Sequence, residues 1–340
     1  GPGELAPRVS LAYAPGREGR TVIRSGAGFF LDRLSPEVVR DVLLLDGQRL
    51  RQVLIVRPGY PDPLRGGEEA QEVPANVVRF HPQLRTPRLI HVSAGLERRL
   101  WGKSTLAITY SGVRGDHLFR SRDLNAPVPP DFQRPDPRVA VLRQIESTAR
   151  LEGHGLDLAF RGSLTRFFQG GILYTLRRAW NDTAGIESLP ADSLDLSREW
   201  ARADQDRRHR FRTYGTMRFA KLFQAGLVLS VHSGRPYNLT TGLDDNRDGR
   251  AQDRPPGIPR NSLSGPGGAT LDLRWSKEFP LAARRGAESP PTLRLTLDAF
   301  NALNRVNHSR VVGNLSSPFF GQPIAAHPAR KVQLSLQLKF

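Results

Sequence analysis

The amino-acid sequence predicts an all-β protein, namely an antiparallel transmembrane β-barrel or the C-terminal portion of one, with about 11 to 12 strands. Three observations lead to this prediction. Apolar and polar residues alternate with a period of two in segments that recur along the chain. The connections between these segments are alternately long and short. No apolar stretch approaches the roughly 18 residues that a transmembrane helix needs, so strands are the elements left to cross a membrane.

The alternation is clearest in the C-terminal segment 331–340, where one face is wholly apolar and the other wholly polar. The apolar residues are Val332, Leu334, Leu336, Leu338 and Phe340. Segments 293–298, 271–276, 156–161 and 106–111 repeat the pattern, and segments 227–231 and 9–13 are weaker copies. A strand between lipid and a water-filled lumen requires such alternation, whereas a strand of a soluble β-sandwich merely permits it.

Connection lengths separate these two folds. From the C-terminus backwards, residues 307–330, 234–267, 182–207 and 115–144 form long connections. Between them lie shorter ones at 282–291, 220–222, 165–168 and 99–103. Outer-membrane barrels have long extracellular loops and short periplasmic turns, and a sandwich has no reason to alternate so regularly.

The N-terminal part continues the same order less clearly. A short turn at 16–19 joins strands predicted at 8–13 and 21–32, and residues 34–87 form a long external excursion. Within it we expect a helical turn at 36–44 and a strand at 52–57. The count is about eleven strands, whereas single-chain bacterial barrels have even numbers. We therefore expect missing N-terminal strands, so that residues 1–340 are a partial barrel domain.

Composition limits the possible sites. Cysteine is absent, which excludes disulfides, thiolate metal sites and a cysteine nucleophile. The formal net charge of +17 would suit a polyanion such as nucleic acid or lipid phosphate. Arginine is nevertheless spread along the chain without the interleaved aromatic residues of single-strand binders, so we expect no nucleic-acid partner. Residues 1–5 carry no signal-peptide pattern, which fits a mature protein or a segment of a longer one.

Several short segments match a known family in order and spacing. They are residues 6–9 (Ala-Pro-Arg-Val), 21–26, 105–110, 112–118, 206–211, 233–236, 253–255 and 298–307, the last containing Phe-Asn and Asn-Arg pairs. On these motifs the chain resembles the C-terminal barrel half of the Oar-like TonB-dependent receptors. The resemblance covers nearly the whole chain but includes neither a plug domain nor a TonB box.

The resemblance implies a protein of the Gram-negative outer membrane, in contact with outer-membrane lipid. It implies energised uptake of a bulky, unknown substrate, with coupling to the TonB system through the missing plug domain. The alternative is an Oar-like outer-membrane structural or adhesion protein without transport. The last strand, with Phe340 at its end, also resembles the signal that the barrel-assembly machinery reads.

One candidate metal site lies in the segment 244–253, Asp-Asp-Asn-Arg-Asp-Gly-Arg-Ala-Gln-Asp. Oxygen side chains at alternate positions followed by Gly249 match the first half of an EF-hand calcium loop. The candidate ligands are Asp244, Asn246, Asp248, Arg250 through its carbonyl, and Asp253. Pro255 stands where the bidentate glutamate belongs, so an external turn without metal is the alternative.

Other residue types predict no chemistry. The sequence contains no nucleophile elbow, P-loop or dinucleotide fingerprint, so we expect no enzyme. The 8 histidines form no zinc-binding pattern. We expect the basic run 207–212 to meet lipid phosphate at the membrane rim. Aromatic girdles at the membrane interfaces could include Trp101, Tyr110, Trp180, Trp200, Tyr214 and Trp275.

Overall fold

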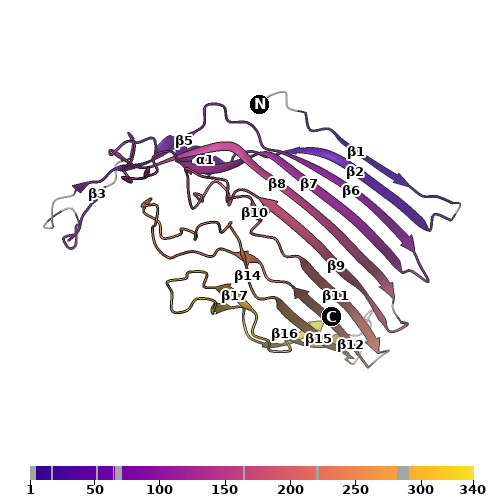
Figure 1. Ribbon diagram of the computed structural model, residues 1–340. Helices are drawn as coiled ribbons and strands as arrows, with labels where there is room; N and C mark the ends of the chain where they lie inside the picture. Colours follow the sequence, from indigo (N-terminus) through magenta and orange to yellow (C-terminus); the bar gives the residue numbers. More distant parts are fainter. Residues whose placement is uncertain are drawn as a thin grey trace.

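A single large curved β-sheet dominates the molecule (Figure 1). The computed structural model describes residues 5–16, 18–50, 53–63, 65, 71–163, 165–219, 222–281 and 291–340. Its sheet has 13 strands, of which an unbroken antiparallel series forms the path β1-β2-β6-β7-β8-β9-β11-β12-β15-β16-β19. The all-β transmembrane-barrel fold and the estimate of about eleven strands are therefore confirmed for the described chain.

The strands of this path are long enough to cross a bilayer, for which about 9 to 11 tilted residues suffice. Only β1, the first edge strand, is shorter. The strands are β1 (Arg8–Tyr13), β2 (Thr21–Leu31), β6 (Arg88–Arg99), β7 (Thr105–Asp123), β8 (Val139–Ser163), β9 (Phe168–Asn181), β11 (His209–Phe219), β12 (Phe223–His232), β15 (Gly268–Pro280), β16 (Thr292–Phe300) and β19 (Lys331–Lys339). The other edge strand is β19, and it does not pair with β1.

The shorter elements all lie in the connections. Strand β10 (Ala201–Arg202) pairs with β9, and β5 (Ala75–Phe80) pairs in parallel with β8, a departure from the purely antiparallel prediction. Three small hairpins are β3 (Val53–Leu54) with β4 (Gln71–Glu72), β13 (Pro236–Tyr237) with β14 (Leu263–Ser264), and β17 (His308–Val311) with β18 (Pro323–Ala326). Within the described residues, no helix is both long and apolar enough to span a membrane.

The connections alternate in length as predicted. The described residues of the connection 32–87 and the connections 124–138, 182–208, 233–267 and 301–330 gather at one end of the strands, here called the loop end (Figure 1). The short connections lie at the opposite, turn end, where most of the predicted turn 282–291 falls outside the described residues. The loop predicted at 115–144 is shorter than expected, because β7 and β8 stay paired beyond the apolar alternation as far as Asp123 and Arg143.

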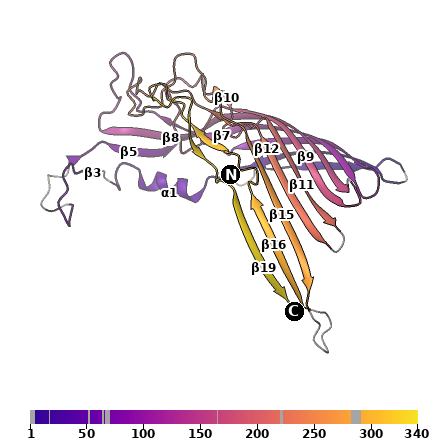
Figure 2. The ribbon, with the colours of Figure 1, turned by 90° about the horizontal axis from the view of Figure 1, so that it is seen from below.

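Helix α1 (Pro36–Leu44) begins and ends where the sequence predicted. The extended backbone of Ser35 and the fixed φ of Pro36 start the helix. Val38 on α1 packs with Val78 of β5 and Ile145 of β8, a small buried cluster at the loop end. Figure 2 shows α1 and β5 side by side near that end of the sheet. The long excursion after β2 is thus anchored on the sheet.

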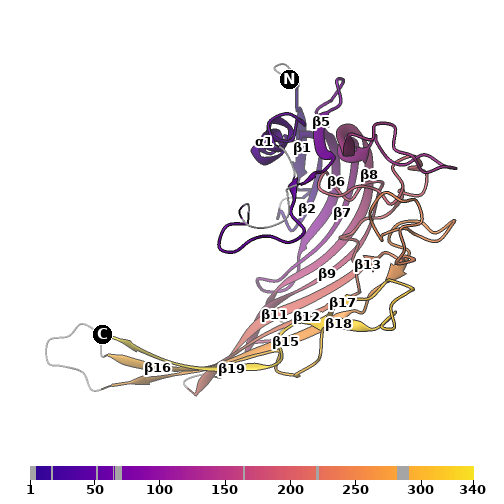
Figure 3. The same ribbon diagram turned by 90° about the vertical axis from the view of Figure 1, so that its left-hand side faces the viewer.

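Strand register sorts the side chains into two faces. Ile108 pairs with Leu158, which pairs with Tyr174 on the next strand, so one face is apolar across several strands. The same face at the C-terminal side carries Leu334 and Leu336, whose side chains are 66% and 68% exposed. So extensive an uncovered apolar surface is what lipid contact requires. The opposite face carries polar side chains such as Arg274 and Asp298. Figure 3 shows the curvature of the sheet to which both faces belong.

Candidate functional site

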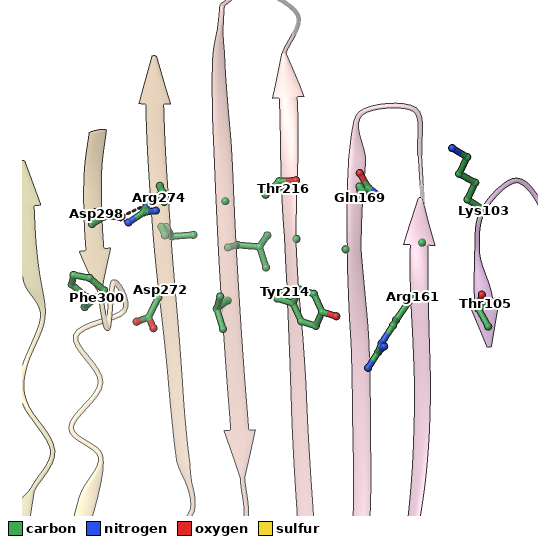
Figure 4. Close-up of a pocket in the computed structure, with 17 residues that line it drawn as sticks. Lys103, Thr105, Arg161, Gln169, Tyr214, Thr216, Asp272, Arg274, Asp298 and Phe300 are labelled. Atoms are coloured by element: carbon green, nitrogen blue, oxygen red, sulfur yellow. Dashed lines mark hydrogen bonds and ion pairs between the residues drawn. The ribbon is translucent and has the colours of Figure 1, made fainter. Parts of the chain in front are cut away.

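A groove of about 750 Å³ lies on the concave polar face (Figure 4). Alternate residues of β7, β8, β9, β11, β12, β15 and β16 line it, because the period of two turns every second side chain inward. Its polar lining includes Arg161, Gln169, Thr216, Asp272, Arg274 and Asp298. In a closed barrel this face would surround a wet lumen.

A directly opposed ion pair gives the groove a fixed charge pattern. Arg274 of β15 faces Asp298 of β16 in register and donates to it through Nε at 2.6 Å and Nη2 at 3.1 Å. The Asp298 side chain is only 9% exposed, whereas that of Arg274 is 63% exposed. The fork geometry orients the guanidinium, and its exposed side remains open to a ligand or to water.

Tyr214 is part of the groove and not of a membrane girdle, which corrects the sequence-based expectation. Its register partner is Gly171 of β9, on the polar face. A Cβ at Gly171 would lie 2.9 Å from both Cζ and Oη of Tyr214, so the ring rests on the glycine backbone. A larger residue at position 171 would therefore displace the Tyr214 ring from this strand.

Aromatic residues of the apolar face form two groups. At the turn end, the rings of Trp101 and Phe160 have centroids 6.5 Å apart, and those of Trp275 and Phe223 have centroids 6.3 Å apart. Farther along the strands, the Oη of Tyr110 on β7 lies 2.7 Å from Nδ1 of His154 on β8. A similar pair, Tyr174 and His209, lies 2.8 Å apart on the neighbouring strands. Trp200 lies outside the strands, in the β9–β11 connection.

The basic run 207–212 does not lie wholly toward lipid, contrary to expectation. Arg210 and Arg212 alternate with His209 and Phe211, and their partners His232 and Ser230 belong to the polar face. Only His209 and Phe211 of these β11 residues share the apolar face with Tyr174. The local sequence showed that this run is basic. It did not show which face of the sheet the arginines occupy, because that depends on the strand register.

A buried network of charges joins the long loops. Arg260 donates through Nη1 to Asp204 at 2.9 Å and through Nη2 to the carbonyl of Asn181 at 3.0 Å. Glu199 pairs with Arg254 and lies 3.7 Å from Arg260. Burial lowers the pKa of Arg260, although Asp204 and Glu199 oppose this. The network links the β9–β11 connection to the β12–β15 connection, which no local sequence signal indicated.

A second set of contacts adds the β7–β8 loop. Arg134 lies 3.2 Å from Asp123 and donates through Nη2 to the backbone carbonyl of Asp248 at 2.8 Å. On β7, Arg120 pairs at 2.7 Å with Asp182 at the start of the next long loop. The loops at this end are therefore joined to one another before any ligand arrives.

The predicted calcium residues lie in one compact turn. The backbone N–H of Gly249 donates to Asp244 Oδ2 at 2.9 Å, and that of Asp248 donates to Asn246 Oδ1 at 3.0 Å. Asp253 Oδ2 accepts from two backbone N–H groups, and the Arg250 carbonyl accepts from Gln252. These oxygens thus accept hydrogen bonds within the turn itself.

Charge in this turn is nevertheless concentrated. Burial, with Asp253 and Asp244 adding to it, raises the pKa of Asp248 to about 6. Burial also raises the pKa of Asp253. Across the described part of the chain, no three His, Asp or Glu side chains are grouped as a metal site. Calcium binding by Asp244, Asn246, Asp248, Arg250 and Asp253 stays a prediction.

The candidate assembly signal forms the edge of the sheet. Val332, Leu334, Leu336 and Leu338 lie on the apolar face of β19, and each is more than half exposed. Phe340 follows the strand and is 96% exposed. Thr292 pairs with Lys339, which places this terminus at the turn end. Recognition of these residues by the assembly machinery stays a prediction.

Comparisons with known proteins agree with this geometry. The outer membrane transporter YddB from Escherichia coli matches with a TM-score of 0.67 and 11% identity, over 99% of this chain and 41% of that chain. A mutant of the ferric enterobactin receptor PfeA from Pseudomonas aeruginosa, in complex with enterobactin, matches with a TM-score of 0.56 and 12% identity, over 97% of this chain and 40% of that chain. The ferripyoverdine receptor of the same organism gives a TM-score of 0.54 and 10% identity, over 97% and 32%.

Identities this low show the fold alone, which is that of TonB-dependent receptor barrels, and the chain spans less than half of each of these proteins. A search of curated protein sequences finds no match. The family model described as outer membrane beta barrel domain matches residues 2–259. With its apolar outer face and polar concave face, the chain belongs to the outer membrane beta barrel domain family and is a protein of the outer membrane.

Proposed function

We propose that this chain is the C-terminal barrel portion of an Oar-like TonB-dependent receptor, which takes up a bulky substrate across the outer membrane. The supporting observation is the wide groove, lined in part by charged and polar side chains, behind a continuous apolar face. The fold is shared with outer-membrane transporters, of which the chain spans less than half. The rest of such a receptor would complete the barrel wall around the groove and supply the plug.

The geometry suits a passage better than a catalyst. Lipid covers the apolar face, and the polar face offers fixed charges such as the Arg274–Asp298 pair to a solute in water. At the loop end the buried Arg254–Glu199 pair holds long loops together above this face. We assign no catalytic step to these residues. Energy would come from the TonB system through a plug domain.

The test is to identify what the full-length receptor imports. A strain lacking the gene and a strain lacking TonB are grown beside the parent strain, and solutes left in the medium are compared by mass spectrometry. We expect one class of solute to remain in both mutant cultures. Restoring the gene with Arg274→Gln should restore surface expression but only part of the uptake.

A different result would contradict the proposal. If neither mutant leaves any solute behind, and loss of the gene weakens cell adhesion or envelope integrity, the protein is structural or adhesive. Uptake that depends on the gene but not on TonB would contradict the energised part of the proposal alone.

A further inference from the structure

Arginines without acidic partners gather at the loop end of the polar face. Arg207 and Arg208 precede β11, Arg210 and Arg212 lie near the start of that strand, and Arg235 follows β12. Among the described residues none of these guanidinium groups forms an ion pair or a side-chain hydrogen bond. The neighbouring loop arginines do have carboxylate partners; they are Arg120, Arg202, Arg254 and Arg260.

Two of these arginines are also partly withdrawn from water. The Nε atoms of Arg207 and Arg208 are buried and have no hydrogen-bond partner in the described structure. Burial lowers the pKa of Arg207, and the nearby charges of Arg235 and Arg210 lower it further. Like charges have therefore been brought together here, and no carboxylate of the described residues compensates their desolvation.

The face that Arg210 and Arg212 occupy follows from the register. Arg210 and Arg212 share the face of Tyr214 and Thr216, which line the groove. They lie nearer the loop end than the groove does, since β11 runs from His209 at the loop end to Phe219 at the turn end. A solute entering from the loop end would meet them before it reaches the groove.

The missing partner is an anion. A guanidinium presents N–H groups in a planar fork that matches a carboxylate or a phosphate, and such contacts are about twice as strong as neutral hydrogen bonds. Lipid phosphate would reach the apolar face, where His209 and Phe211 lie, and not the face of Arg210 and Arg212. A dissolved anion can approach the polar face directly.

We propose that Arg207, Arg208, Arg210, Arg212 and Arg235 form an anion-binding subsite that recognises the carboxylate or phosphate groups of a small, multiply charged substrate. This inference rests on the proposed uptake function and names the chemical class of its substrate. The subsite captures the anion at the loop end and passes it toward the groove lined by Thr216 and Arg274.

The test uses the purified full-length protein in lipid nanodiscs and measures binding by isothermal titration calorimetry. The probes are citrate, pyrophosphate and inorganic phosphate, with trehalose as the uncharged control. We expect citrate and pyrophosphate to bind and trehalose not to bind. Affinity should fall about tenfold in Arg210→Gln and again in Arg210→Gln/Arg235→Gln, and it should weaken as salt is raised. Arg210→Lys, which keeps the charge but not the fork, should retain part of the affinity.

Arg218→Gln is the matched control, because Arg218 lies on the same strand and face near the turn end. Its binding should equal that of the unchanged protein. An equal loss in Arg218→Gln would show unspecific charge attraction and overturn the subsite, as would absence of binding by every anion. Competition from phosphatidylglycerol nanodiscs, compared with phosphatidylcholine, would assign the arginines to lipid headgroups and overturn a dissolved substrate. Heat-modifiable migration in gels verifies that each variant is folded.

The uptake assay separates this inference from the function on which it rests. TonB-dependent uptake of a neutral or cationic solute, without anion binding, would overturn the subsite and leave transport standing. Anion binding in a protein that imports nothing would overturn transport instead.

Discussion

Substitution of Leu297 by arginine tests whether the apolar face lies in lipid. Leu297 lies near the middle of β16, between Trp275 and Leu334 on the adjacent strands, and 41% of it is exposed. Arginine on the lipid face costs a transmembrane barrel about 2–4 kcal/mol near the bilayer midplane and about 0–1 kcal/mol near the interfaces. The central position predicts the larger loss, an approximately 30- to 700-fold change in the folding equilibrium.

Thr296 provides the matched control. It is the preceding residue on the opposite, polar face, between Ser276 and Ser335. Thr296→Arg places the same charge at nearly the same depth but in water, so we expect a loss below about 1 kcal/mol. The measurement is guanidinium-induced unfolding of the full-length protein in phosphatidylcholine vesicles.

Spin labels distinguish lipid from a protein core as the surroundings of Leu297. The chain has no cysteine, so Leu297→Cys and Thr296→Cys can each be labelled alone. A label at 297 should collide mainly with oxygen dissolved in lipid, and a label at 296 with a water-soluble nickel complex. Equal destabilisation by the two arginine variants, or a label at 297 that collides with neither reagent, would refute the assignment of the faces.

Four further predictions concern the groove, the Asp-rich turn and the terminal strand. In vesicle unfolding, Arg274→Gln should destabilise the full-length protein by about 2–3 kcal/mol, because it leaves the buried Asp298 carboxylate unpaired. Asp298→Asn should cost about 1 kcal/mol, because the guanidinium that it leaves unpaired is exposed to water. Equal losses in the two variants would contradict this reasoning. Burial raises the folded-state pKa of Asp248 from 3.8 to about 6, so the folded turn holds this proton more tightly than the unfolded chain and loses stability as pH rises through that window. Hydrogen exchange of residues 244–253, corrected for intrinsic rates, should show this trend and lose it in Asp248→Asn. Calcium at up to about millimolar concentration should give a calorimetric signal that Asp248→Asn abolishes, and no signal from the unchanged protein would contradict the calcium site. Phe340→Ser should lower the amount of heat-modifiable, folded protein in the outer membrane, whereas normal assembly would argue against a terminal signal.

Much of the architecture was predictable because its signals are local. The period of two placed the strands, and the helix at Pro36–Leu44 followed from its own residues. The alternation of long and short connections predicted which end of the strands carries the loops and which end carries the turns. The ends of β7 and β8 were missed because beyond the apolar belt apolar and polar residues no longer alternate along the chain, so the pairing leaves no signal with a period of two. The parallel β5–β8 pairing depends on where a distant loop folds back.

The candidate site divides in the same way. The sequence showed that Tyr214 and the arginines of 207–212 lie in or beside a strand. It did not show which face of the sheet the strand residues occupy, because that depends on the register with the neighbouring strands. Glu199 lies 55 residues from Arg254, and their pairing depends on two long loops meeting. The oxygen side chains of 244–253 matched a calcium motif, whereas the structure shows them accepting backbone hydrogen bonds.

The sequence by itself determined that one face of each strand is apolar and the other polar, because neighbouring side chains on a strand point in opposite directions. Only the tertiary structure decided which side chains of different strands and loops meet. It set Arg274 against Asp298, laid Tyr214 over Gly171, and gave the arginines beside β11 no carboxylate partner among the described residues. The physical reason is that register and loop contacts are properties of pairs of distant segments, whereas alternation is a property of one segment alone.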